Sequence, residues 1–320
     1  MSVRRYLAIG LGSSLVIGAV WIFLAYKRDI DQARTAAQTG ANIVDTSMGP
    51  IEYAERGQGP VLLSIHGAGG GFDQGLDNVA GLVGDGFRVI APSRFGYLRT
   101  PIPKDASPPA QVDAHAALLD TLKIDRAIVV GVSAGARSAL ELALRHPRRV
   151  AALILIVPGT YAPTSPVMIE SSRGSQMAFW VVNHGGDFFW WATERIAPSV
   201  LVRFLGVPPK LVASATADQR ARVLHIVNSV EPLSMRYPGI NIDSQPDLRE
   251  LALADIQVPT LVISARDDLF NTAPAAEFAA SRIPRAKLII YHSGGHLLVG
   301  REAASRAATQ AFLADALAAP

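Results

Sequence analysis

The chain has 320 residues, of which 49% are hydrophobic and 18% are charged; its net charge is +3 and it contains no cysteine. This length allows one catalytic domain with a sizeable buried core, and the composition excludes a disordered protein or a coiled coil. No dense Lys/Arg run occurs, so nucleic acid is not an expected partner. The lack of cysteine excludes disulfides, thiolate catalysis and Cys-based zinc sites.

The N-terminal segment, residues 1–28, contains an uncharged apolar run from Tyr6 to Tyr26. As a helix, such a run reaches about 30 Å, the thickness of a bilayer core. Arg4–Arg5 and Lys27–Arg28 flank it, so we predict a single-pass membrane anchor with the catalytic domain on the extracytoplasmic side. Secretion after signal-peptide cleavage is the alternative, although the run is long for a signal peptide and no small-residue cleavage site follows it.

From residue 49 onwards, short aliphatic runs typical of buried parallel strands alternate with helical patterns. Residues 29–48, before this alternation, are polar and Ala-rich and are expected to form a partly helical connector. The expected strands are Ile51–Glu55, Val61–Ile65, Phe87–Ala91, Ala127–Val132, Ala151–Val157, Thr260–Ser264 and Lys287–Tyr291, and the expected helices are Gln111–Leu122, Ala134–Arg145 and Ala303–Leu317. This alternation predicts an α/β fold with a mostly parallel sheet covered by helices on both faces.

The alternation stops between residues 160 and 250, where helical patterns continue without a strong buried strand. We predict a helical cap at 160–250, which divides the core domain into residues 49–159 and 251–320. An insertion of this length exceeds what a compact sheet needs as a connection. Its aromatic side chains either line a pocket or form the cap's own core, and for a single aromatic the core is favoured; they are Phe179, Trp180, Phe188, Phe189, Trp190, Trp191 and Phe204.

The strongest local signal is a G-x-S-x-G motif at residues 131–135, with Ser133 at its centre. It follows an apolar run and precedes a helical pattern, and this strand–turn–helix setting makes a nucleophile elbow. The elbow holds its serine on a strained backbone, so its neighbours must be small. The following helix directs its positive end towards a developing oxyanion. A glycine-rich turn with an inert serine is the alternative.

The chain after residue 49 resembles the α/β-hydrolase family of esterase- and lipase-like serine hydrolases. His66-Gly67-Ala68-Gly69-Gly70-Gly71 stands where this family has its HG-x-G-type oxyanion loop. The resemblance implies that the backbone N–H groups of Ala68 and Ala134 form the oxyanion hole. His66 lies before the nucleophile, contrary to the family order for a general base, and is expected to brace the loop.

The resemblance also implies an acid and then a histidine after the nucleophile. Two adjacent carboxylates follow the expected strand at 260–264, and alignment assigns the acid to Asp268. Asp267 is the alternative acid, and otherwise it is expected to face solvent or pair with an arginine. In the last loop, His296 matches the family's G-H position, whereas His292 is expected to be a packed or surface histidine.

The implied function is hydrolysis of a carboxylic ester or a related acyl bond through an acyl-enzyme. Ser133 attacks the carbonyl, His296 accepts its proton, and Asp268 orients the imidazole. A serine nucleophile argues against epoxide hydrolases and haloalkane dehalogenases of this fold. Two alternatives stay open: a carbon–carbon bond hydrolase of ring-cleavage products, and a non-catalytic binding protein of the same fold.

The expected substrate is a small, apolar acyl compound, because both the aromatic cap and the predicted anchor favour apolar chemistry. No cofactor is expected, because the glycine-rich loop at 66–71 lacks the G-x-G-x-x-G spacing of a dinucleotide site. No metal is expected either, because the histidines are scattered and no H-E-x-x-H motif occurs.

Overall fold

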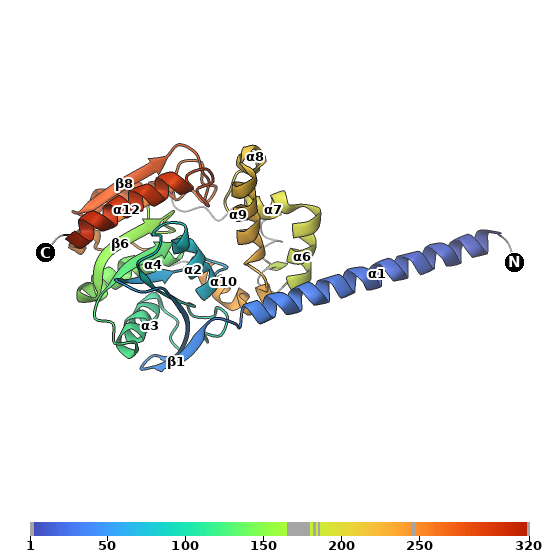
Figure 1. The fold of residues 1–320 in the computed structure, drawn as a ribbon, viewed down its shortest axis with the longest axis horizontal. Helices are drawn as coiled ribbons and strands as arrows, with labels where there is room; N and C mark the ends of the chain where they lie inside the picture. Colours follow the sequence, from blue (N-terminus) through green and yellow to red (C-terminus); the bar gives the residue numbers. More distant parts are fainter. Residues whose placement is uncertain (1–2, 165–179, 182–183, 185, 245–247, 319–320) are drawn as a thin grey trace.

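The computed structural model describes residues 3–164, 180–181, 184, 186–244 and 248–318 (Figure 1). Its centre is an eight-stranded sheet in the order β1-β2-β4-β3-β5-β6-β7-β8. The strands are β1 Asn42–Thr46, β2 Gly49–Arg56, β3 Val61–Ile65, β4 Arg88–Pro92, β5 Ala127–Val132, β6 Val150–Ile156, β7 Thr260–Ala265 and β8 Ala286–Tyr291. β1, β2 and β4 pair antiparallel, and the other pairs are parallel. The predicted, mostly parallel α/β sheet is confirmed.

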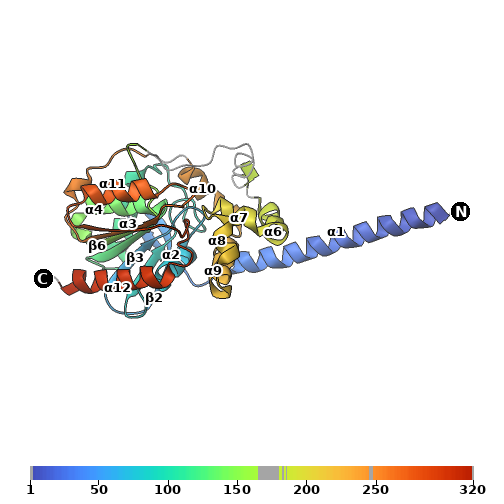
Figure 2. The same cartoon turned by 90° about the horizontal axis from the view of Figure 1, so that it is seen from above.

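Helices cover both faces of this sheet (Figure 2). α3 (Pro108–Thr121), α4 (Gly135–Arg145) and α11 (Ala273–Arg282) lie on one face, and α2 (Phe72–Ala80) and α12 (Glu302–Ala318) lie on the other. Each face has its own hydrophobic core, because side chains alternate across the strands and the central strands are buried on both sides. Three short 3-10 turns complete the described connections: η1 Pro147–Arg149, η2 Leu233–Met235 and η3 Leu253–Asp255.

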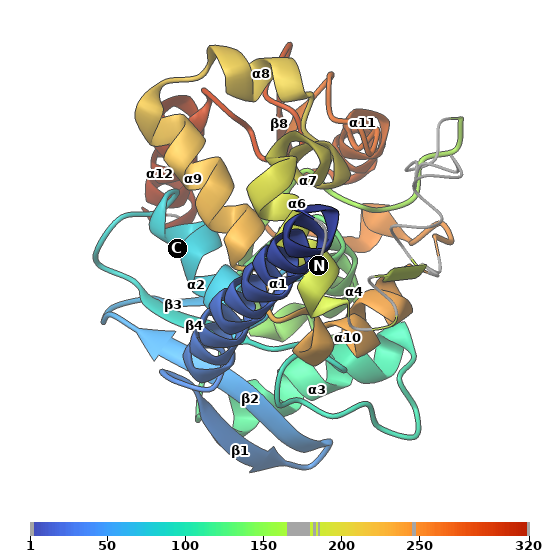
Figure 3. The same cartoon turned by 90° about the vertical axis from the view of Figure 1, so that its right-hand side faces the viewer.

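A layer of helices follows β6 and precedes β7 in the chain. It lies beside the sheet domain in Figure 1 and in front of it in Figure 3. Its members are α6 Asp187–Ile196, α7 Pro198–Phe204, α8 Pro209–Ser214, α9 Ala217–Asn228 and α10 Tyr237–Asp243, and we call residues 186–244 the α6–α10 layer. It has a third hydrophobic core, in which Trp190 is buried and Phe204 packs against it. Phe188 and Phe189 are exposed instead, and Phe179 lies outside the described residues.

The N-terminal helix α1 (Val3–Ala36) extends away from the domain as an arm (Figure 1). The predicted membrane anchor, and the membrane localisation that followed from it, are wrong: within the described residues, no helix combines the length and apolarity that a membrane span needs. Charged side chains begin at Lys27, before α1 ends at Ala36. Beyond Lys27, Asp29 accepts hydrogen bonds from Trp191 (3.0 Å) and Arg195 (2.7 Å) of α6, so this end of α1 packs on the α6–α10 layer.

Candidate active site

Ser133 lies in a tight turn between β5 and α4, with a φ of +51°. Residues other than glycine rarely adopt this left-handed backbone conformation, so the surrounding structure must hold Ser133 in it. Its N–H donates to the carbonyl of Ile156 (2.9 Å). The flanking glycines are required by space: a Cβ on Gly131 would lie 2.6 Å from Cβ of Ala139, and one on Gly135 would meet the carbonyl of His66. The turn therefore presents the Ser133 hydroxyl beyond the end of the sheet.

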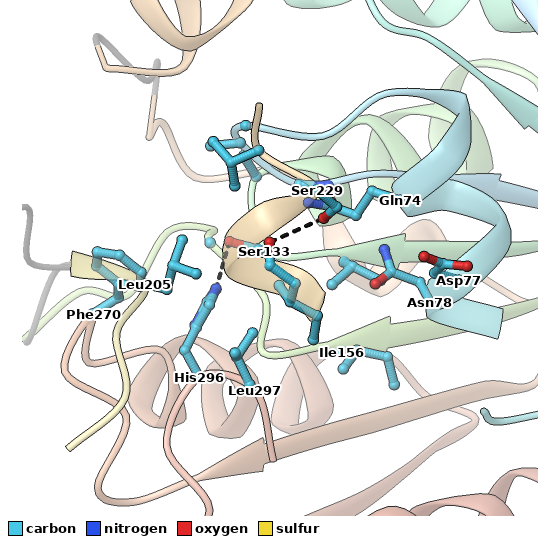
Figure 4. A pocket seen from close by; sticks show the side chains of 18 of the residues that line it. Gln74, Asp77, Asn78, Ser133, Ile156, Leu205, Ser229, Phe270, His296 and Leu297 are labelled. Carbon is cyan, nitrogen blue, oxygen red and sulfur yellow. Dashed lines mark hydrogen bonds between the residues drawn. The ribbon is translucent and has the colours of Figure 1, made fainter. Parts of the chain in front are cut away.

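The structure brings Ser133, His296 and Asp268 together from three separate loops, and Figure 4 shows the contact between Ser133 and His296. Nε2 of His296 lies 2.8 Å from Oγ of Ser133, and Nδ1 of the same ring lies 2.8 Å from Oδ2 of Asp268. The buried Asp268 carboxylate also accepts hydrogen bonds from the N–H of Phe270 (2.9 Å) and the hydroxyl of Thr272. An ionised carboxylate that only accepts fixes the proton of His296 on Nδ1, which leaves Nε2 free to accept the serine proton.

The two adjacent carboxylates at the end of β7 have different partners. Asp268 contacts His296, whereas Asp267 accepts hydrogen bonds from Oγ of Ser293 (2.7 Å) and the N–H groups of Gly294 (2.9 Å) and Gly295 (2.8 Å). The expectation that Asp267 faces solvent or pairs with an arginine therefore differs from the structure. Asp267 holds the backbone of the histidine loop instead, and the only sequence signal for this role was its position next to Asp268.

Ala68 and Ala134, the expected oxyanion donors, both border the cavity in front of Ser133. Within the described part of the chain, neither backbone N–H donates to a protein acceptor. The loop of Ala68 passes close to the nucleophile, since a Cβ on Gly67 would lie 3.1 Å from Cβ of Ser133. Two uncommitted N–H groups beside a serine hydroxyl are what an oxyanion hole requires.

His66 braces the loop of Ala68 and is fully buried. Its Nε2 accepts the N–H of Arg94 (2.9 Å), so the ring proton lies on Nδ1 and is donated to the carbonyl of Gly67 (2.7 Å). Burial and the nearby Arg94 cation hold the pKa of His66 well below its usual range. The ring is therefore neutral and lies apart from the Ser133–His296 pair.

Ser133 and His296 open into a cavity of about 470 Å³ between the sheet domain and the α6–α10 layer. Its wall is largely aliphatic and aromatic and includes Trp190, Phe204 and Phe270. The basic side chains of Arg222 and His225 in its lining each contact a carboxylate that also lines it: Arg222 contacts Glu302 (3.2 Å), and His225 contacts Asp77 (2.8 Å). Among the described residues, no cluster of three histidine, aspartate or glutamate side chains could hold a metal ion.

Comparison with known proteins identifies the family of the chain. The family model described as alpha/beta hydrolase fold matches residues 60–302, and the chain belongs to this family of hydrolases. It is 34% identical to a 2-hydroxy-6-oxo-6-phenylhexa-2,4-dienoate hydrolase of Comamonas testosteroni, over 77% of this chain and 84% of that protein. It is 28% identical, with the same coverage, to a 2-hydroxy-6-oxononadienedioate/2-hydroxy-6-oxononatrienedioate hydrolase of Paraburkholderia xenovorans.

A solved structure of an alpha/beta hydrolase fold protein from Nakamurella multipartita is similar in fold. It has 26% sequence identity and a TM-score of 0.67, and the alignment covers 85% of this chain and 98% of that chain. The similarity in fold therefore extends over most of this chain and nearly all of that one.

Proposed function

We propose that the protein is a serine hydrolase with Ser133 as nucleophile, His296 as general base and Asp268 as the acid that orients it. The observation that carries this proposal is the line of two 2.8 Å contacts from Ser133 through His296 to Asp268 at the end of an apolar cavity. The uncommitted N–H groups of Ala68 and Ala134 serve as oxyanion donors. The helices over the cavity act as a cap, for which we keep the bounds 160–250.

We further propose that the bond it cleaves is the carbon–carbon bond beside the ketone of a 2-hydroxy-6-oxo-dienoate. The relatives named above support this choice, since each is described as a hydrolase of such a compound and the chain covers 84% of its length. These compounds contain no ester, so the hydrolysable bond is the one between carbons 5 and 6. In the keto form, carbon 5 lies between a ketone and an enone, and the electron pair left there on cleavage is delocalised.

Each step has a group in place for it. Oγ of Ser133 attacks carbon 6 and gives its proton to His296, while the N–H groups of Ala68 and Ala134 stabilise the oxyanion. Collapse breaks the C5–C6 bond, and carbon 5 takes the proton from His296. A water deprotonated by His296 then attacks the acyl-enzyme, which releases the second acid and restores the Ser133 hydroxyl.

Hydrolysis of a neutral carboxylic ester is the second candidate, and one observation favours it. The basic side chains of Arg222 and His225 already contact carboxylates, and the wall of the cavity is largely aliphatic and aromatic. Such a wall suits a neutral acyl chain, because burying a free carboxylate without an available cation is costly.

The two candidates are separated by the ratio of kcat/KM for 2-hydroxy-6-oxo-6-phenylhexa-2,4-dienoate and for p-nitrophenyl butyrate. We expect kcat/KM to be at least 10-fold higher for the dienoate than for the ester. Turnover of the dienoate is measured by the loss of its conjugated absorbance. A preference for the ester would favour the second candidate. Reaction with a fluorophosphonate tests the alternative of a non-catalytic binding protein, which would leave Ser133 unlabelled in the folded chain.

The roles of the residues are tested by paired variants. Ser133→Ala and His296→Ala are expected to lower kcat about 10⁴-fold or more. His292→Ala is the matched control, because His292 is exposed at the start of the same loop, and it should keep full activity. Turnover by a folded Ser133→Ala variant would contradict the assignment of the nucleophile.

A further inference from the structure

The oxyanion loop, residues 66–71, is held by side chains from two other parts of the chain. On one side, Arg94 in the loop after β4 donates through Nε to the carbonyl of His66 (3.0 Å). On the other side, Arg236 of the cap donates through Nη1 to the carbonyl of Gly70 (2.7 Å). These two contacts flank Ala68, whose N–H is the proposed oxyanion donor.

Asp243, at the end of α10 in the cap, fixes the first of these arginines. Its carboxylate accepts both Nη1 (2.8 Å) and Nη2 (2.5 Å) of Arg94 and also the hydroxyl of Tyr97 (2.5 Å). The hydroxyl of Tyr97 in turn accepts the N–H of Gly69 (3.4 Å), inside the oxyanion loop. One cap carboxylate is thereby connected to the loop on both sides of Ala68.

These contacts are shielded from water. Arg236 is 1% exposed, Arg94 5% and Tyr97 0%. Arg236 also pairs with Asp73 at the start of α2: its Nη1 donates to Oδ1 of Asp73 (3.1 Å) and its Nη2 donates to Oδ2 (2.5 Å). A buried guanidinium keeps its place only while its partners stay in theirs, because an uncompensated charge is strongly disfavoured there. The paired arginines therefore allow one arrangement of cap and loop.

We infer that Arg236 and Asp243 are positioning residues through which the cap holds the oxyanion loop, so that Ala68 N–H is directed at the reacting carbonyl only while residues 233–243 are docked. The inference rests on the proposed function, in which Ala68 is an oxyanion donor. Backbone contacts from the cap to the loop of Tyr97 dock the same segment: Leu98 N–H donates to Met235 (2.7 Å), and Gly239 N–H donates to Gly96 (3.0 Å). Opening of the cap would then disable catalysis as well as expose the cavity.

Arg236→Gln is the principal test, and Arg195→Gln is its matched control. Arg195 is also a cap arginine paired with an aspartate, Asp29, but it contacts α1 and not the loop. We expect Arg236→Gln to lower kcat between about 10- and 100-fold with KM changed less than 3-fold, because loss or slight misplacement of one oxyanion donor has effects of this order. The affinity for a boronic acid that mimics the tetrahedral adduct should fall in parallel with kcat. The control should change none of these.

Hydrogen exchange of the folded full-length chain gives a readout that does not depend on activity. The hydrogen-bonded amides of Gly67, Gly69 and Gly70 should exchange at least 10-fold faster in Arg236→Gln, while those of β3 stay unchanged. If Arg236→Gln does not fold, Tyr97→Phe replaces it. That variant keeps the ring and removes only the hydroxyl between Asp243 and Gly69, so we expect faster exchange at Gly69 and a 3- to 10-fold lower kcat.

Exchange and kcat at wild-type values in a folded Arg236→Gln or Tyr97→Phe variant would overturn the inference. An equal loss in Arg195→Gln would overturn it as well, because the effect would then be a general loss of cap stability. Failure of the proposed function has a different signature: the wild-type chain would not react with a fluorophosphonate at Ser133, while the exchange measurement would still report on the loop.

Discussion

Replacement of Gly206 by alanine tests how closely the cap is fitted to the acid and histidine loops. Gly206 lies between α7 and α8 with a φ of +76°, and its carbonyl accepts the N–H groups of both Leu269 and His296 at 3.1 Å. A Cβ at this position would lie 2.7 Å from Cβ of His296 and 2.5 Å from Cδ2 of Phe270. Real Cβ atoms do not approach other carbons this closely, so the neighbours must move.

The expected cost has two parts. An alanine in the left-handed region costs about 1–2 kcal/mol, and the enforced overpacking costs about 1–3 kcal/mol more. The free energy of unfolding should therefore fall by about 2–5 kcal/mol. If the contact is relieved by moving His296 by about 1 Å, kcat should fall about 100-fold.

Urea unfolding and kcat on the preferred substrate measure the two effects. Gly40→Ala is the control, because Gly40 has a φ of +83° and no atom within 4 Å of its Cβ position. It should show only the backbone cost of about 1–2 kcal/mol and full kcat. If Gly206→Ala and Gly40→Ala were equally stable and equally active, the proposed fit between Gly206 and His296 would be refuted.

Asp267→Asn should lower kcat about 10-fold with Asp268 still in place, because the amide accepts fewer hydrogen bonds from the histidine loop; a kcat equal to wild type would contradict this role. Burial, aided by the Glu194 carboxylate, raises the pKa of Glu231 from its usual 4.5 to about 7. The folded chain thus holds a proton that the unfolded chain releases, and stability falls as pH rises from about 4.5 to 7. Between these pH values the free energy of unfolding should fall by about 3 kcal/mol less in Glu231→Gln than in the wild type. Urea unfolding at pH 4.5 and 8 measures this difference, and an unchanged pH dependence in the variant would refute it.

The central strands could be predicted from sequence because their environment leaves a local pattern. β3 and β5 occupy the expected residues, 61–65 and 127–132, since strands buried on both faces are continuously aliphatic. β1 lies instead within the expected connector at 29–48. It is an edge strand with mostly exposed side chains, so no apolar run distinguishes it.

The N-terminal prediction failed for a related reason. Hydropathy reports the apolar character of a run, and it does not report where a helix continues or what it contacts. α1 runs on to Ala36, past the charges that begin at Lys27, and Asp29 is bound by side chains of α6 about 160 residues away. The partners of Asp29 leave no mark on the sequence around it.

By itself, the sequence determined the sheet, the tight turn at Ser133 and the order in which Ser133, Asp268 and His296 follow the strands. These features are local, and the carboxyl ends of parallel strands meet at one edge of a sheet, so the loops after them converge. The tertiary structure decided which of Asp267 and Asp268 contacts His296, because adjacent residues point in different directions. It also decided that Arg236 contacts the loop at residues 66–71 and that Asp243 contacts Arg94. Those contacts join residues 166 and 149 positions apart, and they exist only after the cap has docked on the sheet domain.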